Sequence, residues 1–252
     1  MRQGYTRRCE ILRGNRVSLS AQTGRSSGNK PLDGKTIVVT GAAGILGAAV
    51  ASKAKSLGAT VELVDVVAGF KSKLGRTHLV DLTDTTAVSR CIAALGDFDG
   101  VANIAGGFDM GPSVHATEDR MWNFLFDINV TTLRRMLSAT VPVLVARGRG
   151  SIVNVGALGA LKGVGNMGAY TAAKGTVMHL TEALSDEVRS SGVNVNAVLP
   201  SLIDTPRNRA DMPDADHNRW VSPDALADVV CFLLSDAARA VHGALVPVRG
   251  LV

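Results

Sequence analysis

The sequence lacks the features that mark several large classes of protein. Its only cysteines, Cys9, Cys91 and Cys231, have no paired or metal-ligand spacing, so neither a disulfide framework nor a zinc site is expected. Cys91 and Cys231 lie in apolar helical patterns and are predicted to be core thiols in a reducing compartment. No apolar run approaches the roughly 20 residues that a membrane-spanning helix needs. With 46% hydrophobic and 19% charged residues, the composition is typical of a soluble globular protein without a membrane partner.

The net charge of +5 is confined to one end of the chain. Residues 1–30 carry +6 and the remaining residues together carry −1, so the body has no basic footprint and no nucleic-acid partner is expected. The first 30 residues show no apolar periodicity, and we expect a disordered extension there and one folded domain in residues 31–252. The expected compartment is the cytoplasm, or the mitochondrial matrix if this arginine-rich, acid-poor extension is a presequence.

Strand and helix patterns alternate from Gly34 onward. The expected strands are residues 36–40, 60–65, 78–81, 100–104, 151–156, 193–199 and 244–248. The expected helices are residues 44–57, 84–95, 117–146 with a bend near Pro142, a helix from Tyr170 through Val188, and 223–234. This alternation predicts an α/β fold with a doubly wound parallel sheet of about seven strands and helices on both faces. The ligand crevice then lies at the carboxyl ends of the strands.

A glycine-rich turn, TGAAGILG at residues 40–47, stands where the first expected strand meets the first expected helix. Glycine permits a tight turn and a close approach of the backbone to a pyrophosphate, and amides at a helix start favour phosphate charge. Such a turn alone is common in loops, but its place between a strand and a helix indicates a dinucleotide site. The residues expected to contact the cofactor here are Gly41, Ala43, Gly44, Ile45, Leu46 and Gly47.

Asp65 ends the second expected strand, 18 residues after Gly47. Its carboxylate can accept hydrogen bonds from the adenosine ribose hydroxyls and would repel a 2′-phosphate. No Arg or Lys lies in the glycine-rich turn or immediately after Asp65. NAD is therefore predicted as the preferred cofactor, with NADP possible. The alternative is a strand-end aspartate that faces solvent.

The pair most typical of catalysis lies in residues 151–174, where a short apolar strand and a glycine-rich loop lead into a helix. Tyr170 and Lys174 are four residues apart on this helix and therefore share one face. A phenol with an ordinary pKa of about 10 is a poor acid–base catalyst near neutrality, and a nearby cation would lower that pKa. A solvated helix face could carry the same spacing, but the preceding strand and loop favour catalysis.

Together these motifs resemble those of the short-chain dehydrogenase/reductase family over residues 34–250. The matching segments are residues 40–47, Asp81-Leu82, Asn103-Ile104-Ala105-Gly106, Asn129 in Ile-Asn-Val, Tyr170 with Lys174, and residues 200–205. The resemblance implies a single-domain Rossmann-like fold and an NAD(P)-dependent oxidoreductase for a small organic substrate. It also implies a homodimer or homotetramer.

The resemblance assigns the catalytic roles by position. Tyr170 would donate the proton, and Lys174 would tune the pKa of Tyr170 and hold the nicotinamide ribose. Asn129 would place a water that links Lys174 to solvent. The further cofactor contacts that it implies are Asp81 and Leu82 beside the adenine, Asn103 as a brace of the central strands, Ala105, Gly106, Pro200, and Ile203 and Thr205 at the nicotinamide amide and pyrophosphate.

Position 157 departs from the family pattern. The family's catalytic serine lies thirteen residues before the tyrosine, and Ala157 stands there in this chain. That serine hydrogen-bonds the substrate carbonyl oxygen, and losing such a donor costs a carbonyl reductase about 3 kcal/mol, or roughly two orders of magnitude in rate. Either the enzyme is impaired, or its substrate does not need the donor.

Two segments favour a substrate without such an oxygen. Residues 105–108 and 204–220 are locally similar to quinonoid dihydropteridine reductase, a family member that also lacks the serine. A quinonoid ring accepts hydride and proton on ring atoms, so no ketone oxygen has to be held. The residues expected near the substrate are Met110, Ala157, Met212 and Trp220, of which Met212 and Trp220 could instead anchor their loop to the body of the protein.

Three functions therefore remain open from the sequence. The first is an NAD(H)-preferring enzyme for a quinonoid dihydropteridine. The second is a carbonyl or alcohol dehydrogenase, or a 3-oxoacyl reductase-like enzyme, without the usual serine. The third is a weakly catalytic NAD-binding sensor.

Overall fold

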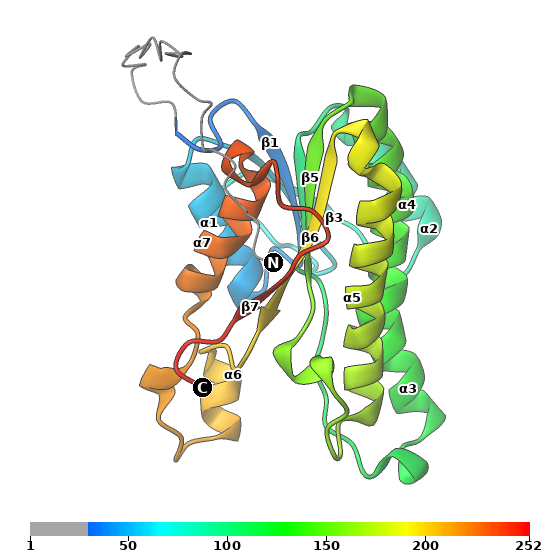
Figure 1. Ribbon diagram of the computed structural model, residues 1–252, viewed down its shortest axis with the longest axis vertical. Coiled ribbons are helices and arrows are strands. Elements are labelled where there is room, and N and C mark those ends of the chain that lie inside the picture. Colours follow the sequence, from blue (N-terminus) through cyan, green and yellow to red (C-terminus); the bar gives the residue numbers. More distant parts are fainter. Residues whose placement is uncertain (1–29) are drawn as a thin grey trace, which may run out of the picture.

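The computed structural model of the chain describes residues 30–252, so the predicted extension lies almost entirely outside the described residues (Figure 1). Within them, one sheet of seven parallel strands has the order β3-β2-β1-β4-β5-β6-β7. The strands are β1 Thr36–Thr40, β2 Thr60–Asp65, β3 Arg76–Leu79, β4 Gly100–Asn103, β5 Gly150–Val155, β6 Val193–Pro200 and β7 Leu245–Val248. The predicted α/β class and doubly wound parallel sheet are confirmed.

Helices cover both faces of this sheet. The α-helices of residues 30–252 are α1 Ile45–Ser56, α2 Thr85–Leu95, α3 Asp119–Phe126, α4 Thr132–Arg147, α5 Gly168–Val188, α6 Pro206–Asp211 and α7 Pro223–Leu234. In Figure 1 α1 and α7 lie on one side of the sheet, and α2, α4 and α5 lie on the other. Successive side chains of β1 point to opposite faces of the sheet. Ile37 and Val39 belong to the hydrophobic core on the side of α1 and α7, and Val38 belongs to the core on the side of α2, α4 and α5.

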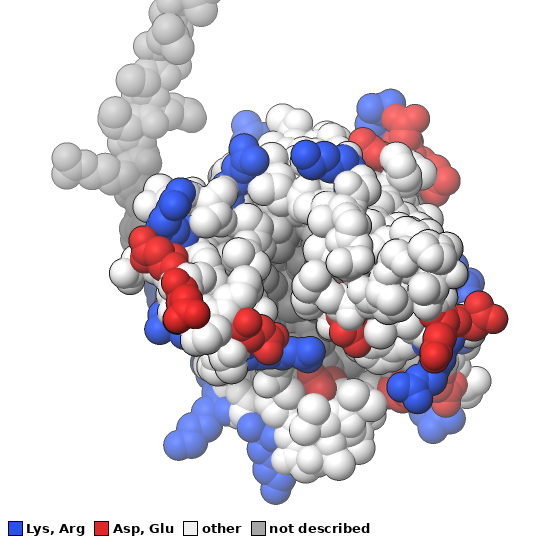
Figure 2. Space-filling model, turned by 90° about the horizontal axis from the view of Figure 1, so that it is seen from below, with Lys and Arg blue, Asp and Glu red and all other residues white. Residues whose placement is uncertain are grey.

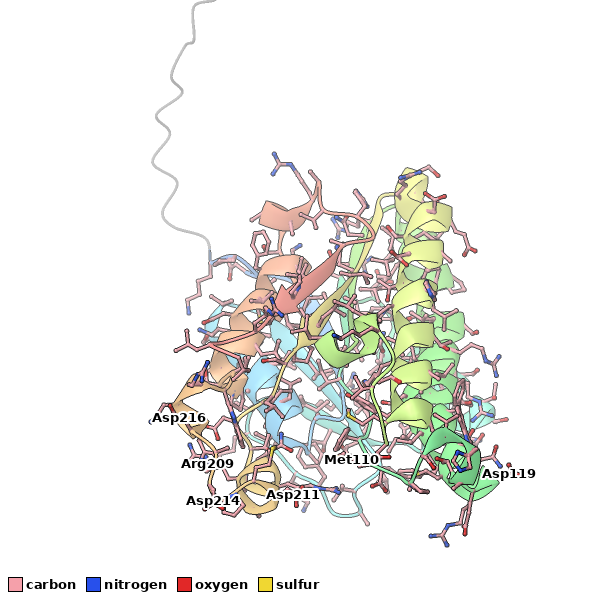
Figure 3. The ribbon with its side chains drawn as sticks, turned by 60° about the horizontal axis from the view of Figure 1, so that its bottom comes forward. Met110, Asp119, Arg209, Asp211, Asp214 and Asp216 are labelled. Carbon is pink, nitrogen blue, oxygen red and sulfur yellow. The ribbon has the colours of Figure 1, made fainter. Side chains whose placement is uncertain are left out.

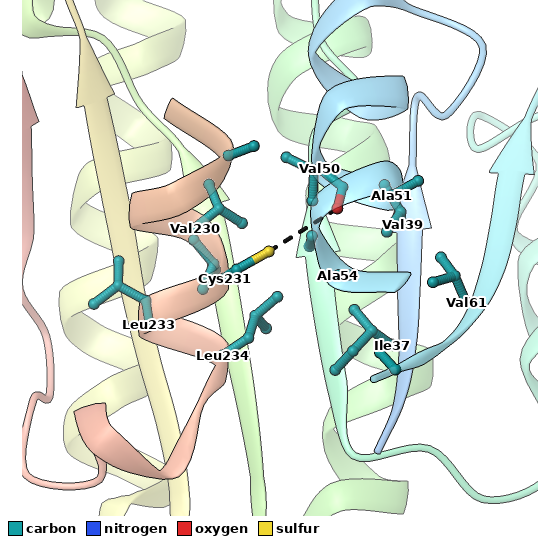
Figure 4. Close-up of a cluster of buried hydrophobic side chains, with 14 of the residues drawn as sticks. Ile37, Val39, Val50, Ala51, Ala54, Val61, Val230, Cys231, Leu233 and Leu234 are labelled. Atoms are coloured by element: carbon teal, nitrogen blue, oxygen red, sulfur yellow. Dashed lines mark hydrogen bonds between the residues drawn. The ribbon is translucent and has the colours of Figure 1, made fainter. Parts of the chain in front are cut away.

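The core between α1, α7 and the sheet contains one of the cysteines (Figure 4). Cys231 is fully buried, and its Sγ lies 4.0 Å from the carbonyl oxygen of Val50 on α1. Burial raises the pKa of the Cys231 thiol to about 12. Cys91 is only half-buried, on the opposite face of the sheet. The prediction of a core thiol is therefore confirmed for Cys231 and holds only partly for Cys91.

The third strand begins two residues earlier than predicted. Arg76 pairs with Glu62 of β2 in the strand register, and its guanidinium donates to the Glu62 carboxylate at 2.9 and 3.0 Å. This ion pair stabilises Arg76, a charged residue, within the strand. The apolar periodicity of the sequence instead predicts that the strand starts at His78. The strand ends at Leu79, and the Val80 amide still donates to the carbonyl of Asp65.

The long helix predicted for residues 117–146 is interrupted before Pro142. A π-helical turn at Asp127–Thr131 separates α3 from α4, and Pro142 lies inside α4. The wider turn lets the Asn129 side chain reach the carbonyl oxygen of Leu125, four residues earlier, at 3.0 Å. The irregularity therefore lies at a predicted site residue.

Candidate active site

The glycine-rich turn after β1 is built so that only glycine fits at its ends. Gly41 has a φ of +64°, in the left-handed region. A Cβ on Gly47 would lie 2.1 Å from the carbonyl oxygen of Gly41. The N-cap of α1, Gly44, has no side chain, and the first turn of the helix carries no acidic residue. The amides around Ile45 and Leu46 therefore meet no side-chain anion of their own helix, which fits the pyrophosphate of a dinucleotide.

Asp65 closes this turn from β2. Its Oδ2 accepts a hydrogen bond from the amide of Ala43 at 2.9 Å, and its Oδ1 accepts one from the amide of Val67 at 3.0 Å. The residue is 9% exposed and forms no ion pair within residues 30–252. The carboxylate is thus fixed beside the glycine-rich turn with its charge uncompensated.

Thr40, whose role the sequence did not indicate, joins the loops after β1 and β4. Its Oγ1 accepts hydrogen bonds from the amides of Ile104 and Ala105 at 3.0 and 3.1 Å. A Cβ on Gly41 would lie 2.8 Å from the Ala105 amide, so the two loops meet closely. This contact places Gly106 next to the glycine-rich turn.

The two residues predicted for the adenine side follow β3. The Asp81 carboxylate accepts hydrogen bonds from the hydroxyl and the amide of Thr83, which lower the pKa of Asp81. Leu82 is 7% exposed and lines a cavity described below. The guanidinium of Arg135 on α4 donates to the carbonyl of Thr83 and holds this turn against the helix.

Tyr170 and Lys174 lie one turn apart on α5, as predicted. Lys174 is 6% exposed, and its Nζ donates to the carbonyl oxygen of Val155 at the end of β5, at 2.8 Å. The Tyr170 ring meets the ring of Phe108 edge to face, with 4.8 Å between centroids and 87° between planes. The loop after β4 therefore forms one wall beside the phenol.

The pKa values of this pair differ from the prediction made from spacing. Burial raises the pKa of Tyr170 to about 12 and lowers the pKa of Lys174 to about 8. The expected lowering of the Tyr170 pKa by the cation is absent, because burial disfavours the charged form of both groups. In addition, Lys174 directs a proton to the carbonyl of Val155.

Asn129 lies in the π-helical turn with its amide fully engaged. Its Nδ2 donates to the carbonyls of Gly107 and Leu125 at 3.0 Å each, and its Oδ1 accepts from the amide of Gly107 at 3.1 Å. A Cβ on Gly106 would lie 2.8 Å from this Oδ1 and 3.3 Å from Nζ of Lys174. Gly106 therefore lies between Asn129 and Lys174, where no larger residue fits without displacement.

A small cavity of about 10 Å³, partly open to solvent, extends from Lys174 toward the core. Its polar lining residues are Thr40, Asn103, Asn129, Thr132 and Lys174. Asn103 donates from Nδ2 to Asn154 on β5 at 2.9 Å, and Asn154 donates to Thr181 on α5 at 2.9 Å. Asn103 thus ties β4 to β5, in keeping with the brace that the family resemblance implies.

Ala157 follows β5 in extended backbone and is 5% exposed. The short turn Leu158–Leu161 then leads away from it toward α5. With alanine there, this position offers no hydroxyl to a substrate oxygen.

Pro200 ends β6, and residues 204–220 form a separate segment, the α6 segment, at the carboxyl end of the sheet. An isolated β-bridge between Ile203 and Val221 holds the two ends of this segment together. Thr205 caps α6 by accepting from the amide of Asn208 at 3.2 Å. Its hydroxyl is thus engaged locally, and the predicted contacts of Ile203 and Thr205 with a cofactor stay predictions.

The structure separates the predicted substrate residues into two groups. Trp220 is 7% exposed and packs on His217 within the α6 segment, with 4.5 Å between ring centroids. Met212 is half-buried, and its carbonyl oxygen lies 2.9 Å from Nε2 of His217. The Trp220 ring thus packs within the α6 segment, and the substrate contacts of Met212 and Trp220 stay predictions. Met110 is 55% exposed and lies between the α6 segment and α5 (Figure 3).

Comparisons with known proteins agree with this geometry. A family model described as enoyl-(acyl carrier protein) reductase matches residues 41–250. Short-chain dehydrogenase/reductase cdmF of Talaromyces verruculosus is 32% identical over 246 residues, covering 84% of this chain and 94% of its own. 2-(S)-Hydroxypropyl-CoM dehydrogenase 3 of Xanthobacter autotrophicus is 30% identical over 247 residues, covering 87% of this chain and 96% of its own. The crystal structure of carveol dehydrogenase from Mycobacterium avium in complex with NAD matches with a TM-score of 0.80 at 27% identity, covering 88% of this chain and 98% of that one.

The chain therefore belongs to the short-chain dehydrogenase/reductase family and is an NAD(P)-dependent oxidoreductase. Among residues 30–252, no helix is both long and apolar enough to cross a membrane.

Proposed function

We propose that this enzyme prefers NAD(H) and transfers hydride between the nicotinamide and the carbonyl or alcohol carbon of a small organic substrate. The observation that carries the proposal is the placement of Tyr170 and Lys174 on α5, next to the end of β5. When bound, the cofactor supplies or accepts the hydride. The preference for NAD(H) is supported by Asp65, whose uncompensated carboxylate would face the 2′-phosphate of NADP(H).

Each residue of the chain has a defined part in this proposal. Because its pKa is raised to about 12, Tyr170 keeps its proton at neutral pH and can donate it to a substrate oxygen during reduction. Lys174 is held by Val155 and orients the nicotinamide ribose and the phenol. Asn129 fixes the loop at Gly107 and so shapes the passage between Lys174 and solvent.

A second candidate substrate is a quinonoid dihydropteridine, and one observation favours it. Ala157 leaves the site without the donor that a ketone oxygen usually receives, and a quinonoid ring does not need that donor. The packing of Trp220 within the α6 segment removes one of the flat surfaces expected to stack on the pterin. The weakly catalytic NAD-binding sensor rests on Ala157 alone. A homodimer or homotetramer remains the family-based expectation for the assembly.

The experiment that tests the proposal is a screen of NADH and NADPH oxidation with ketones and a quinonoid dihydropterin. It is run on the wild type and on Tyr170→Phe, which keeps the aromatic ring that packs on Phe108. We expect NADH-dependent turnover of a ketone that falls at least about 100-fold in the variant. Tight NADH binding with no turnover of any compound would instead favour the sensor.

A further inference from the structure

Three loops at the carboxyl end of the sheet expose large apolar side chains. The exposed fractions are 41% for Phe108, 55% for Met110 and 58% for Val114 after β4, 58% for Leu161 after β5 and 37% for Leu202 after β6. These three strands are neighbours in the sheet, so their loops emerge side by side. Large exposed apolar side chains gathered at one end of a domain mark a candidate binding surface.

Two contacts connect this apolar surface to the catalytic helix. Phe108 packs edge to face on Tyr170. Val114 lies over the first residue of α5, where a Cβ on Gly168 would come within 2.6 Å of its Cγ2. Apolar groups of the loop after β4 therefore border the phenol that donates the proton in the proposed function.

Each arginine of the α6 segment has a hydrogen-bond or ion-pair partner within the protein, and for two of the three that partner is a carboxylate. Arg209 donates two hydrogen bonds to the carboxylate of Asp204, at 2.5 and 2.7 Å. Arg207 lies 3.7 Å from the carboxylate of Asp211. Arg219 donates to the carbonyl oxygen of Leu251 at 2.8 and 3.2 Å. All three arginines of residues 204–220 thus have an internal partner.

The remaining loops offer little positive charge. Residues 104–118 contain no Lys or Arg, and residues 156–167 contain only Lys162, which is exposed at the end of its turn. The α6 segment itself has four aspartates against its three arginines, a net charge of −1. Figure 2 shows the hollow on this face walled mainly by uncharged residues, with charged side chains gathered around its rim.

From these observations, and resting on the proposed function, we infer that the substrate is a neutral, hydrocarbon-rich alcohol or ketone. Its hydrocarbon part packs on the apolar surface of Phe108, Met110 and Val114, and its oxygen meets Tyr170. A carboxylate, phosphate or sulfonate on the substrate would lose its hydration next to apolar side chains, with no free guanidinium to pair with it. The site therefore selects against anionic substrates.

A matched series of ring ketones tests this inference. 4-Methylcyclohexanone, 4-oxocyclohexanecarboxylate and the methyl ester of that acid differ only in the group opposite the carbonyl. Binding of each to the NADH complex of Tyr170→Phe, in which turnover is suppressed, is measured by calorimetry, and turnover by the wild type is followed by NADH absorbance. We expect 4-methylcyclohexanone and the ester to bind at least about 100-fold more tightly than the carboxylate, and kcat/KM to follow the same order.

The two readouts separate this inference from the proposed function. Equal or tighter binding of the carboxylate would overturn the inference, whatever the turnover. The expected order of binding with no turnover of any ketone would leave the inference standing and contradict hydride transfer to a carbonyl. Tight binding of a quinonoid dihydropterin with no binding of the ring ketones would overturn the inference and favour the second candidate substrate.

A pair of variants checks that the loop after β4 supplies the wall. Met110→Lys introduces a cation on the exposed apolar surface, and Met110→Gln introduces polarity without charge. We expect Met110→Lys to shift the binding ratio at least about tenfold toward the carboxylate and Met110→Gln to shift it by much less. If Met110→Lys left the ratio of affinities for the carboxylate and the neutral ketones unchanged, this would contradict the claim that the loop after β4 contacts the substrate.

Discussion

The Nζ of Lys174 donates a hydrogen bond to the carbonyl oxygen of Val155 at 2.8 Å, which fixes the catalytic helix to the end of β5. The ammonium is buried, and burial lowers the pKa of Lys174 to about 8. Burial of the Tyr170 phenol raises its pKa and keeps it protonated. The free enzyme is thus prepared to give a proton to a substrate oxygen.

The lowered pKa of Lys174 predicts a pH-dependent contribution to stability. The unfolded chain, with an ordinary lysine pKa of 10.5, binds more protons than the native protein between pH 8 and 10.5. In this window the free energy of unfolding therefore rises with pH relative to a variant without the group, by up to about 3 kcal/mol. Denaturant unfolding of the wild type and of Lys174→Met at pH 7, 9 and 10 measures the difference. A difference that stays constant with pH would show that Lys174 titrates normally.

Tyr170 is predicted to ionise only in strongly alkaline solution when no cofactor is bound. Its pKa is raised to about 12 by burial, and Tyr5 is the only other tyrosine in the sequence. The ultraviolet absorbance of tyrosinate, titrated for the wild type and Tyr170→Phe, isolates the Tyr170 transition by subtraction. We expect this transition near pH 12. A midpoint near neutrality in the free enzyme would mean that Lys174 does lower the Tyr170 pKa before the cofactor binds.

Much of the site follows from local sequence, and the rest depends on contacts between distant segments. The glycine-rich turn and the shared helix face of Tyr170 and Lys174 could be predicted from the sequence, because each depends only on residues close together along the chain. The packing of Phe108 on Tyr170 could not, because the loop after β4 meets α5 only in the folded protein. The pairing of Arg209 with Asp204 joins two residues of one loop, but it depends on how that loop folds, and the sequence alone does not show whether a loop arginine has a partner.

Two further differences have similar causes. The start of β3 depends on the ion pair between Arg76 and Glu62 of another strand. The π-helical turn at Asn129 depends on the backbone of Gly107, which the side chain of Asn129 contacts across the site. Apolar periodicity carries no information about either contact.

Asp65 is predicted to set the preference for the cofactor. In the wild type, NADH should bind at least about tenfold more tightly than NADPH, because the 2′-phosphate would face an unpaired carboxylate. Asp65→Asn keeps an oxygen acceptor for the amide of Ala43 but removes the charge, so the preference should shrink mainly through tighter NADPH binding. Fluorescence titration with both cofactors measures this. Equal affinities in the wild type would refute the role of Asp65.

Alanine substitutions at Gly106 and Gly107 form a matched pair that tests the close contact of Gly106 with Asn129 and Lys174. A Cβ at Gly106 would press on Asn129 Oδ1 at 2.8 Å and on Lys174 Nζ at 3.3 Å. The nearest atoms to a Cβ at Gly107 belong to the side chain of Ile128, at 3.2 Å and beyond. We expect Gly106→Ala to lower kcat by about tenfold or more and Gly107→Ala to have a much smaller effect. Similar losses in both variants would point to general disturbance of the loop.

Ala157→Ser is predicted to separate the two candidate substrates. For a ketone, the new hydroxyl offers a donor to the developing oxyanion and should raise turnover by up to about two orders of magnitude. For a quinonoid dihydropterin there is no such oxyanion, so activity should stay level or fall. Steady-state kinetics of the wild type and of Ala157→Ser with both substrates decides between them. A wild type inactive on the pterin, with ketone reduction gained in Ala157→Ser, would remove the pteridine candidate.

The measurement that tests the central claim most directly is the transfer of deuterium from the cofactor to the substrate. NADH with deuterium in place of both hydrogens at the reactive carbon of the nicotinamide is incubated with 4-methylcyclohexanone and enzyme, and the alcohol is analysed by mass spectrometry. We predict an alcohol with one deuterium on its carbinol carbon, formed by the wild type and suppressed in Tyr170→Phe although that variant still binds NADH. An alcohol without deuterium, or equal deuterium transfer by Tyr170→Phe, would contradict the account.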